Sequence, residues 1–472
     1  MIIGRKKEQA ILQKAYNSEY SEFVAVYGRR RIGKTFLVRE FFNYKFTFYH
    51  TGVSKEKTRI QLKSFQSSLK KQGLKDAPTP KNWLDAFDML AELIEKSSDK
   101  KKVIFIDEMP WIDAPRSSFL PAFEHFWNGW ASARKDVLLI ICGSATSWIM
   151  NKVIHNHGGL HNRVTYNIPL EPFTLNECEQ YAKNLKLEMS RRQLLECYMI
   201  LGGVPYYWSK LQSDISLAQN VDELFFSRHG ALKDEFKELY ASLFSNPEPY
   251  MNIITALGQN KTGLTREDII NHCKINDSGK LTKYLENLES CGFIRKYFSI
   301  GKKTKDSIYQ LIDNYTLFYF KFIRDNRVTD KHQWSKNIDT PLYNTWCGLS
   351  FEKVCLQHSD QIKEKLGISG VISSEYSWHT EGTPEYPGAQ IDLLIDRNDD
   401  VINLCEMKFT KAPFRIDKEY DLALQRKREI FKRKTKTQKA IHITMVTSSG
   451  LEDNSFAQDI QSQVTADDLF KE

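Results

Sequence analysis

The stretch at residues 24–35 constrains this chain more than any other part of its sequence. It reads VAVYGRRRIGKT, an apolar strand that runs directly into the spacing G-x-x-x-x-G-K-T. In this pattern the glycines let backbone N–H groups turn toward phosphates, the lysine reaches the β and γ phosphates, and the hydroxyl holds Mg²⁺. Residues 36–42 continue with helical character, which is the expected context. The alternative is a glycine turn with an incidental lysine.

The sequence therefore predicts a nucleotide site that begins at this loop. The residues expected to bind the nucleotide are Gly28, Arg29, Arg30, Arg31, Ile32, Gly33, Lys34, Thr35 and Phe36. Lys34 is also expected to take part in catalysis, and Thr35 to contact the metal ion. The three arginines are open to two interpretations, because they either brace phosphates or face solvent.

A second part of the site is predicted at residues 103–108, which read VIFIDE. Four apolar residues in a row fit a strand that is buried on both faces of a parallel sheet. Ligands of such sheets bind at the carboxyl ends of the strands, where Asp107 and Glu108 lie. Asp107 is expected to hold Mg²⁺ at the nucleotide, and Glu108 to orient or deprotonate the attacking water. A helix cap or a solvated turn is the alternative for this acidic pair.

Two further residues are candidates for γ-phosphate contacts. Ser144 follows the apolar stretch 137–142 and is expected to hydrogen-bond the γ-phosphate or the water. The alternative is that Ser144 or Thr146 caps the next helix. Arg163 either contacts the γ-phosphate, within its own subunit or across a subunit boundary, or lies solvated in a loop. Whether the chain forms a homo-oligomer is left open.

Composition agrees with a large enzyme rather than with a membrane or secreted protein. The 472 residues are 41% hydrophobic, which is enough for about three domains with their own cores. No apolar run reaches about 18 residues, and the N-terminus lacks the apolar stretch of a signal peptide. The eight cysteines include no C-x-x-C pair, which is typical of cytosolic proteins, so we expect a cytoplasmic location. The net charge of +8 favours polyanionic partners only mildly.

The middle of the chain is predicted to be helical and then to form a winged helix-turn-helix. Residues 175–244 have a helical pattern that GGVP at 202–205 interrupts, either as a connection between helices or as the hinge of a lid over the nucleotide. Three short helices follow within residues 251–289, the second of them capped by Thr265, and a hairpin begins at residue 292. The residues expected to meet DNA phosphates are Lys280, Lys283, Lys302 and Lys303. The alternative is a module that packs or binds proteins.

The last third of the chain carries a second set of acidic and basic residues. Residues 389–396 and 401–409 read as two strands of a hairpin, with Asp392 on the first strand. Side chains at i and i+2 of a strand share a face, so Glu406 and Lys408 project together from the second. We expect catalysis here: Asp392, Glu406 and Glu352 would hold Mg²⁺ or Mn²⁺ beside a scissile phosphate, while Lys408 positions water or offsets charge. Exposed acids and a lysine on a hairpin are the alternative.

A basic helix and a further strand complete this region. Residues 417–439 hold many lysines and arginines, among them Lys427 and Arg428, which are expected to follow a DNA backbone. A solvated helix face is the alternative. The apolar stretch 440–447 reads as another strand and completes the order αβββαβ, which predicts a restriction-endonuclease-like fold.

Several of these segments together resemble a known family. The glycine loop, the strand end IDE at 106–108, CGS at 142–144 and GGVP at 202–205 resemble the prokaryotic archaeal-ATPase family of AAA-like P-loop ATPases, which is related to the STAND class. The C-terminal part resembles the PD-(D/E)xK nuclease-like domain often fused to them, although Ile391 stands where that pattern has proline. The resemblance implies an α/β fold with a parallel-sheet ATPase core, a helical lid, a winged helix and a nuclease-like domain. We expect these at residues 1–173, 174–245, 246–312 and 313–472.

The residues and the resemblance lead to one hypothesis and one rival. The hypothesis is an ATP-binding and ATP-hydrolysing cytosolic protein that acts on DNA, with a metal-dependent nuclease-like domain gated by the nucleotide state. The rival is a nucleotide-operated signalling switch whose nuclease-like domain is a catalytically silent module that binds DNA or protein. ATP and Mg²⁺ are the expected cofactors, with Mn²⁺ as an alternative at the nuclease-like site.

Overall fold

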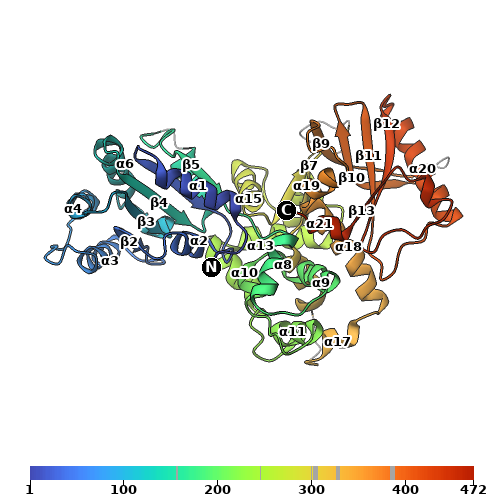
Figure 1. Cartoon of the computed structure of the whole chain (residues 1–472), viewed down its shortest axis with the longest axis horizontal. Coiled ribbons are helices and arrows are strands. Elements are labelled where there is room, and N and C mark those ends of the chain that lie inside the picture. Colours follow the sequence, from blue (N-terminus) through green and yellow to red (C-terminus); the bar gives the residue numbers. More distant parts are fainter. Residues whose placement is uncertain (156–157, 245, 299, 301–306, 326–329, 383–387) are drawn as a thin grey trace. The chain divides into compact units, whose positions relative to one another are not determined.

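The computed structural model describes residues 1–472 except 156–157, 245, 299, 301–306, 326–329 and 383–387 (Figure 1). The chain forms two compact units. The first holds Met1–Glu171 and Ser242–Ser245, and the second holds Pro172–Ala241 and Asn246–Glu472. The four domains expected from the sequence divide the chain more finely than these two units and stay a prediction. Within the described residues, no helix is both long and apolar enough to cross a membrane.

A five-stranded parallel sheet forms the centre of the first unit. Its strands lie in the order β2-β3-β4-β1-β5 (Figure 1). Their bounds are β1 Glu22–Tyr27, β2 Phe48–Thr51, β3 Lys102–Asp107, β4 Val137–Gly143 and β5 Tyr166–Pro169. Every residue of β4 is buried, as are all but one residue of β1 and of β3. The uninterrupted apolar runs are thus strands covered on both faces, and the predicted strands at 103–107 and 137–142 are confirmed.

Helices cover both faces of this sheet (Figure 1). They are α1 Lys6–Asn17, α2 Lys34–Phe41, α3 Thr58–Lys71, α4 Trp83–Lys96, α5 Met109–Ile112, α6 Phe119–Gly129 and α7 Thr146–Ile149. Because side chains alternate along a strand, Phe23 of β1 enters a core formed with α3, α4 and α6. Its neighbour Val24 enters the opposite core, with Leu12 of α1 and Val38 of α2.

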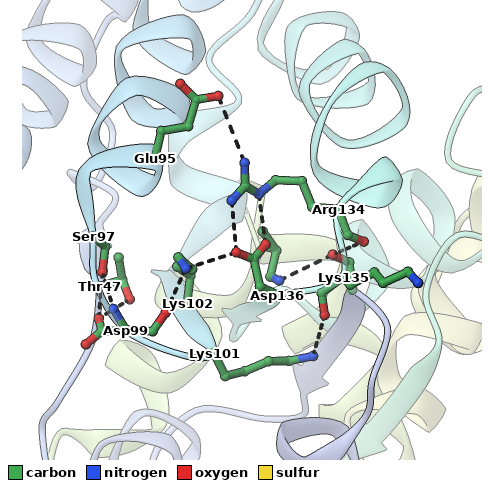
Figure 2. Close-up of polar contacts among 11 residues, drawn as sticks. Thr47, Glu95, Ser97, Asp99, Lys101, Lys102, Arg134, Lys135 and Asp136 are labelled. Carbon is green, nitrogen blue, oxygen red and sulfur yellow. Dashed lines mark hydrogen bonds and ion pairs between the residues drawn. The ribbon is translucent and has the colours of Figure 1, made fainter.

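A network of charged groups fixes the amino ends of β3 and β4, at the edge of the sheet away from the predicted nucleotide site. Asp136, just before β4, accepts hydrogen bonds from Arg134 at 2.8 and 2.9 Å and pairs with Lys102 of β3 at 2.9 Å (Figure 2). The hydrogen bonds from Arg134 are the main reason why the pKa of Asp136 lies well below its usual value. The carboxylate therefore joins two strands that are far apart in sequence.

We expect Asp136→Ala to lower the free energy of unfolding of the first unit by about 1 to 2 kcal/mol, because Arg134 and Lys102 lose the carboxylate that they share. Lys135→Ala is the matched control, since the Lys135 side chain is exposed and only its carbonyl joins the network. Urea denaturation compares both variants with the wild type. Equal stability of the three proteins would contradict this role of Asp136.

Helices open the second unit. The predicted helical segment contains α8 Leu175–Asn184, α9 Arg191–Leu201, α10 Pro205–Trp208, α11 Leu217–Val221 and α12 Glu235–Leu243. Gly202 ends α9 with a φ of 61°, a conformation that favours glycine. Gly203 lies against the backbone of Phe173, and a Cβ at this position would meet the Phe173 carbonyl oxygen at 1.9 Å. The two glycines form a tight connection between helices, which was one of the two predicted interpretations.

Three helices and a small antiparallel sheet follow. The helices are α13 Glu248–Gln259, α14 Arg266–Cys273 and α15 Gly279–Ser290, and the strands, in the order β6-β8-β7, are β6 Leu264–Thr265, β7 Ile294–Tyr297 and β8 Ile308–Leu311. Thr265 caps α14, as the sequence predicts. Lys280 and Lys283 are exposed on α15, whereas Lys302 and Lys303 lie outside the described residues. A winged helix that contacts DNA stays a prediction.

A mixed five-stranded sheet, in the order β13-β12-β11-β10-β9, forms the C-terminal part of the second unit (Figure 1). Its strands are β9 Ser373–Thr380, β10 Ala389–Arg397, β11 Val401–Lys408, β12 Ala440–Thr447 and β13 Ser462–Thr465. The first three pair antiparallel, whereas β11, β12 and β13 are parallel. The remaining helices are α16 Asn314–Phe318, α17 Gln333–Asn337, α18 Pro341–Gln357, α19 Ser359–Lys365, α20 Lys418–Thr435 and α21 Ala466–Leu469.

Two helices position this sheet. Phe431 of α20 packs on Ile391 and Leu404 of the sheet, and α18 packs against β11. The elements α18, β9, β10, β11, α20 and β12 occur in the order that the sequence analysis described, and β13 is an additional strand. Membership of the restriction-endonuclease-like class stays a prediction.

His358 joins the end of α18 to the start of α8. Its Nδ1 bonds the carbonyl oxygen of Val354 at 2.8 Å, so Nε2 accepts the N–H of Leu175 at 3.0 Å. The ring is 1% exposed, and burial lowers the pKa of His358 to about 4. The imidazole is therefore neutral in the folded protein at neutral pH.

This buried ring predicts a pH dependence of stability. Between about pH 6.5 and about pH 4 the unfolded chain binds a proton at His358 that the folded chain does not, so stability falls as the pH falls. In this range we expect the wild type to lose up to about 1.4 kcal/mol of unfolding free energy per pH unit more than His358→Gln. Above about pH 7 the two curves should run parallel. Urea denaturation across this range measures both, and identical slopes at low pH would contradict the assignment.

Candidate functional site

The loop between β1 and α2 has the backbone shape that its glycines allow. Gly28 has a φ of 144°, and a Cβ there would meet the carbonyl oxygen of Leu170 at 2.2 Å. Gly33 has a φ of 91° and starts α2. Both conformations disfavour any residue with a Cβ. The predicted arrangement of strand, glycine loop and helix is present.

Lys34 lies inside this loop and is 5% exposed. Its ammonium group donates to the carbonyl oxygens of Gly28 at 2.9 Å and Arg29 at 2.7 Å. The charge is therefore held at the start of α2, where backbone N–H groups and the helix dipole also favour an anion.

The hydroxyl of Thr35 meets the carboxylate of Asp107. The Thr35 Oγ1 lies 3.1 and 3.0 Å from the two carboxylate oxygens, across 72 residues of sequence. Asp107 is 3% exposed and ends β3. A hydroxyl and a carboxylate are oxygen ligands of the kind that Mg²⁺ prefers, so these two residues fit a magnesium ion.

Glu108 is held next to this pair in an unusual conformation. Its φ of 46° lies in the left-handed region, which is uncommon for a residue with a Cβ. Its carboxylate accepts the Ser144 hydroxyl at 2.8 Å and the Ser144 N–H at 3.2 Å. Ser144 does not cap the next helix, because the N-cap of α7 is Ala145 and it makes no side-chain bond. Ser144 instead positions Glu108, a contact between side chains that neither predicted interpretation named.

Cys142 of β4 is fully buried, and its thiol has a charged neighbour. Burial, and then the nearby carboxylate of Asp107, raise the pKa of its thiol far above the usual value. The thiol is therefore a neutral donor close to the carboxylate. Position in an apolar strand predicts the burial of Cys142 but does not predict this contact.

The remaining loop residues differ in exposure. Arg29 is 3% exposed, which excludes the solvent-facing interpretation for this arginine. Arg30 and Arg31 are half-buried, Ile32 is buried, and Phe36 is exposed. Arg163 is exposed in the turn before β5, and within the described part of the chain no recorded contact joins its side chain to Lys34. A γ-phosphate role for Arg163 stays a prediction.

The second predicted cluster centres on Glu406 of β11. Its carboxylate accepts the Tyr420 hydroxyl at 3.0 Å and the Lys427 ammonium at 2.6 Å, both from α20, and Lys408 lies 3.3 Å away. Burial raises the pKa of Glu406, but the two ammonium groups outweigh it and hold the pKa below its usual value. Lys427, predicted to contact DNA, therefore already has a carboxylate partner, and Arg428 beside it is half-buried.

Glu352 of α18 connects the members of this cluster. Burial, and then the charge of Asp392, raise the pKa of Glu352 to about 7, and Glu406 adds to the rise. The three predicted carboxylates thus lie within electrostatic reach of one another. Among the described residues, however, no group of three His, Cys, Asp or Glu side chains is close enough to hold a metal ion.

A β-bulge places Asp392. Between Ile391 and Leu394 the pairing with β9 advances by three residues on β10 but by two on β9, from Trp378 to Tyr376. Such an extra residue re-aims a side chain and is frequent beside active sites. The sequence did not predict the bulge or the hydrogen bond from Tyr420 to Glu406, because both depend on contacts between separate elements.

Comparisons with known proteins address the first of these sites. Residues 3–211 match the sequence profile of a family described as an ATPase domain predominantly from Archaea. The uncharacterized protein MJECL04 of Methanocaldococcus jannaschii is 26% identical over 421 residues, which cover 87% of this chain and 88% of that protein. The uncharacterized ATP-binding protein MJ0423 of the same organism is 38% identical over 45 residues, 10% of this chain and 76% of that protein.

Solved structures give a partial likeness. The Walker-type ATPase PABY2304 of Pyrococcus abyssi is 16% identical, with 68% of this chain and 96% of that chain covered and a TM-score of 0.48. The ORC2 protein of Aeropyrum pernix is 12% identical, with 75% and 95% covered and a TM-score of 0.39.

The profile match spans the glycine loop, the strand end at Asp107 and Glu108, and Ser144, which are the residues that the first unit brings together. The site has the arrangement that a triphosphate and a magnesium ion require. Residues 3–211 of this chain are therefore similar to an ATPase domain that is described as predominantly from Archaea.

Proposed function

We propose that this protein is a cytoplasmic enzyme that binds ATP with Mg²⁺ at the first site, hydrolyses it there and uses the nucleotide state to control an action on DNA. The observation that carries the ATPase part is the meeting of Thr35 with Asp107 beside Lys34. Thr35 and Asp107 would hold Mg²⁺, which, when bound, offsets the charge of the phosphates. Glu108, fixed by Ser144, orients the attacking water and accepts its proton.

Two substitutions separate binding from hydrolysis. We expect Lys34→Ala to lose most ATP affinity, because the buried ammonium contacts the phosphates. Glu108→Gln should keep ATP affinity but slow phosphate release by about 100-fold or more, because an amide cannot accept the proton. Lys63→Ala, at an exposed position of α3, is the control and should behave as the wild type. Calorimetry measures binding and a phosphate assay measures hydrolysis; unchanged phosphate release in Glu108→Gln would refute the role of Glu108.

We propose further that the C-terminal sheet of the second unit is a metal-dependent nuclease-like domain. Its support is the electrostatic coupling of Glu352 to Asp392, Glu406 and Lys408, together with the bulge at Asp392. Two carboxylates and a lysine at the end of neighbouring strands suit phosphodiester hydrolysis, because oxygen ligands hold Mg²⁺ or Mn²⁺ and the ammonium offsets charge. Lys280 and Lys283, exposed on α15, would add contacts to DNA phosphates.

One observation favours the rival function, a nucleotide-operated switch with a silent DNA- or protein-binding domain. Lys427 and Tyr420 already use the Glu406 carboxylate, and a divalent ion must compete with that ammonium. If the divalent ion does not displace the Lys427 ammonium, the domain binds DNA or protein but does not cleave DNA. The two functions therefore differ in one measurable property.

Plasmid cleavage decides between them. We expect the wild type to nick or cut plasmid DNA with Mg²⁺ or Mn²⁺, with a rate that changes when ATP is added, and Lys408→Ala to lose this activity. Lys331→Ala, an exposed lysine outside the cluster, should cut as the wild type does. Gel electrophoresis of the plasmid gives the rates. Retention of DNA without cleavage under every condition would refute the nuclease and support the silent module.

A further inference from the structure

A cavity of about 280 Å³ lies within the second unit, between the small antiparallel sheet and the C-terminal sheet. One wall is formed by Arg295 and Tyr297 of β7 and Gln310 of β8, and the other by Gln390 and Asp392 of β10. The two sheets meet here, because β7 packs against β9. A water molecule takes up about 30 Å³ in the liquid, so the cavity has room for a phosphate group with its neighbours.

Arg295 is fixed in this wall by its neighbours. Its Nε donates to the Gln310 side-chain oxygen at 2.8 Å, and its guanidinium lies over the ring of Tyr297, with 4.4 Å between guanidinium carbon and ring centroid. Both neighbours are themselves tethered, since Tyr297 donates to the Thr262 carbonyl and Gln310 to the Lys261 carbonyl. Within the described residues, no hydrogen bond is recorded for the two Nη groups of Arg295. A rigidly held guanidinium thus lines the cavity with two donors.

Asp392 faces the same cavity from the other sheet. Burial lowers the pKa of Arg295, while the charges of Asp392 and Glu375 act in the opposite direction. Both carboxylates therefore lie within electrostatic reach of the guanidinium. No ion pair between Arg295 and Asp392 is recorded among the described residues. A cation and a carboxylate therefore stand on opposite walls with space between them.

This arrangement matches the needs of a phosphodiester. A guanidinium presents parallel N–H groups that fit two phosphate oxygens. A carboxylate can hold a divalent metal ion that contacts the same phosphate. We propose that Arg295 is the phosphate-binding residue of the Asp392 site, so that the DNA backbone enters the cavity between the two sheets. The inference rests on the proposed nuclease-like function of Asp392, Glu406 and Lys408, and it adds a residue from outside the C-terminal sheet.

Binding of a fluorescein-labelled DNA duplex to the full-length protein, followed by anisotropy at several salt concentrations, tests the inference. Ca²⁺ replaces Mg²⁺, so that binding is measured without cleavage. We expect Arg295→Gln to bind about tenfold more weakly and to reduce the slope of log affinity against log salt by about one, as loss of one phosphate contact requires. Arg295→Lys should keep the slope but regain only part of the affinity, because its ammonium lacks the fork.

Lys296→Gln is the matched control. Lys296 neighbours Arg295 on β7, is exposed, and lies by the rings of Phe298 and Tyr309 rather than in the cavity. It should bind DNA with the wild-type affinity and slope. A difference between Arg295→Gln and Lys296→Gln therefore cannot come from charge alone.

The outcomes separate this inference from the nuclease itself. Thermal unfolding followed by circular dichroism shows whether each variant is folded. If Arg295→Gln does not fold, the DNA affinity of Arg295→Lys tests the phosphate contact. Wild-type affinity and salt slope in folded Arg295 variants would overturn the phosphate contact, whatever the plasmid assay shows. Weakened binding in these variants, together with no plasmid cleavage by the wild type, would uphold the contact and refute the nuclease.

Discussion

The hydrogen bond between Thr35 and Asp107 is the contact that brings the two halves of the candidate nucleotide site together. It joins the start of α2 to the end of β3 across 72 residues, and it forms only because β4 holds β1 and β3 in one parallel sheet. The apolar runs bury the strands on both faces, and the charged network at their amino ends holds β3 and β4 from the other edge. The candidate nucleotide site and the charged network around Asp136 therefore lie at opposite edges of one sheet.

The second unit presents a different balance. Glu406 is stabilised by ammonium groups from Lys427 and Lys408, so its negative charge persists in a buried position. The same ammonium groups oppose the arrival of a divalent cation, because they already satisfy the carboxylate. Burial first, and then the charges of Asp392 and Glu406, raise the pKa of Glu352. Activity at this sheet depends on whether a metal ion and a phosphate together outweigh these internal pairs.

Sequence reasoning was most successful where one local pattern determines the structure. The glycine loop, the buried strands of the first unit and the cap at Thr265 follow from short segments, and all are present. It was less successful where distant elements meet. The contact of Ser144 with Glu108, the pairing of Lys427 with Glu406 and the position of Arg295 opposite Asp392 each depend on how strands and helices pack, which residue spacing does not encode. The additional strand β13 was missed because SQVT at 462–465 is too short to show a period.

The extra residue in β10 has a consequence for how this protein changes over evolutionary time. Its pairing with β9 is regular on each side of Asp392, so loss of one codon there would restore an unbroken ladder with β9. The same deletion would remove the displaced carboxylate or turn it to another face. One mutational event can therefore remove this carboxylate from its present face while β10 still pairs with β9, so relatives that share the architecture need not share the acidic residue.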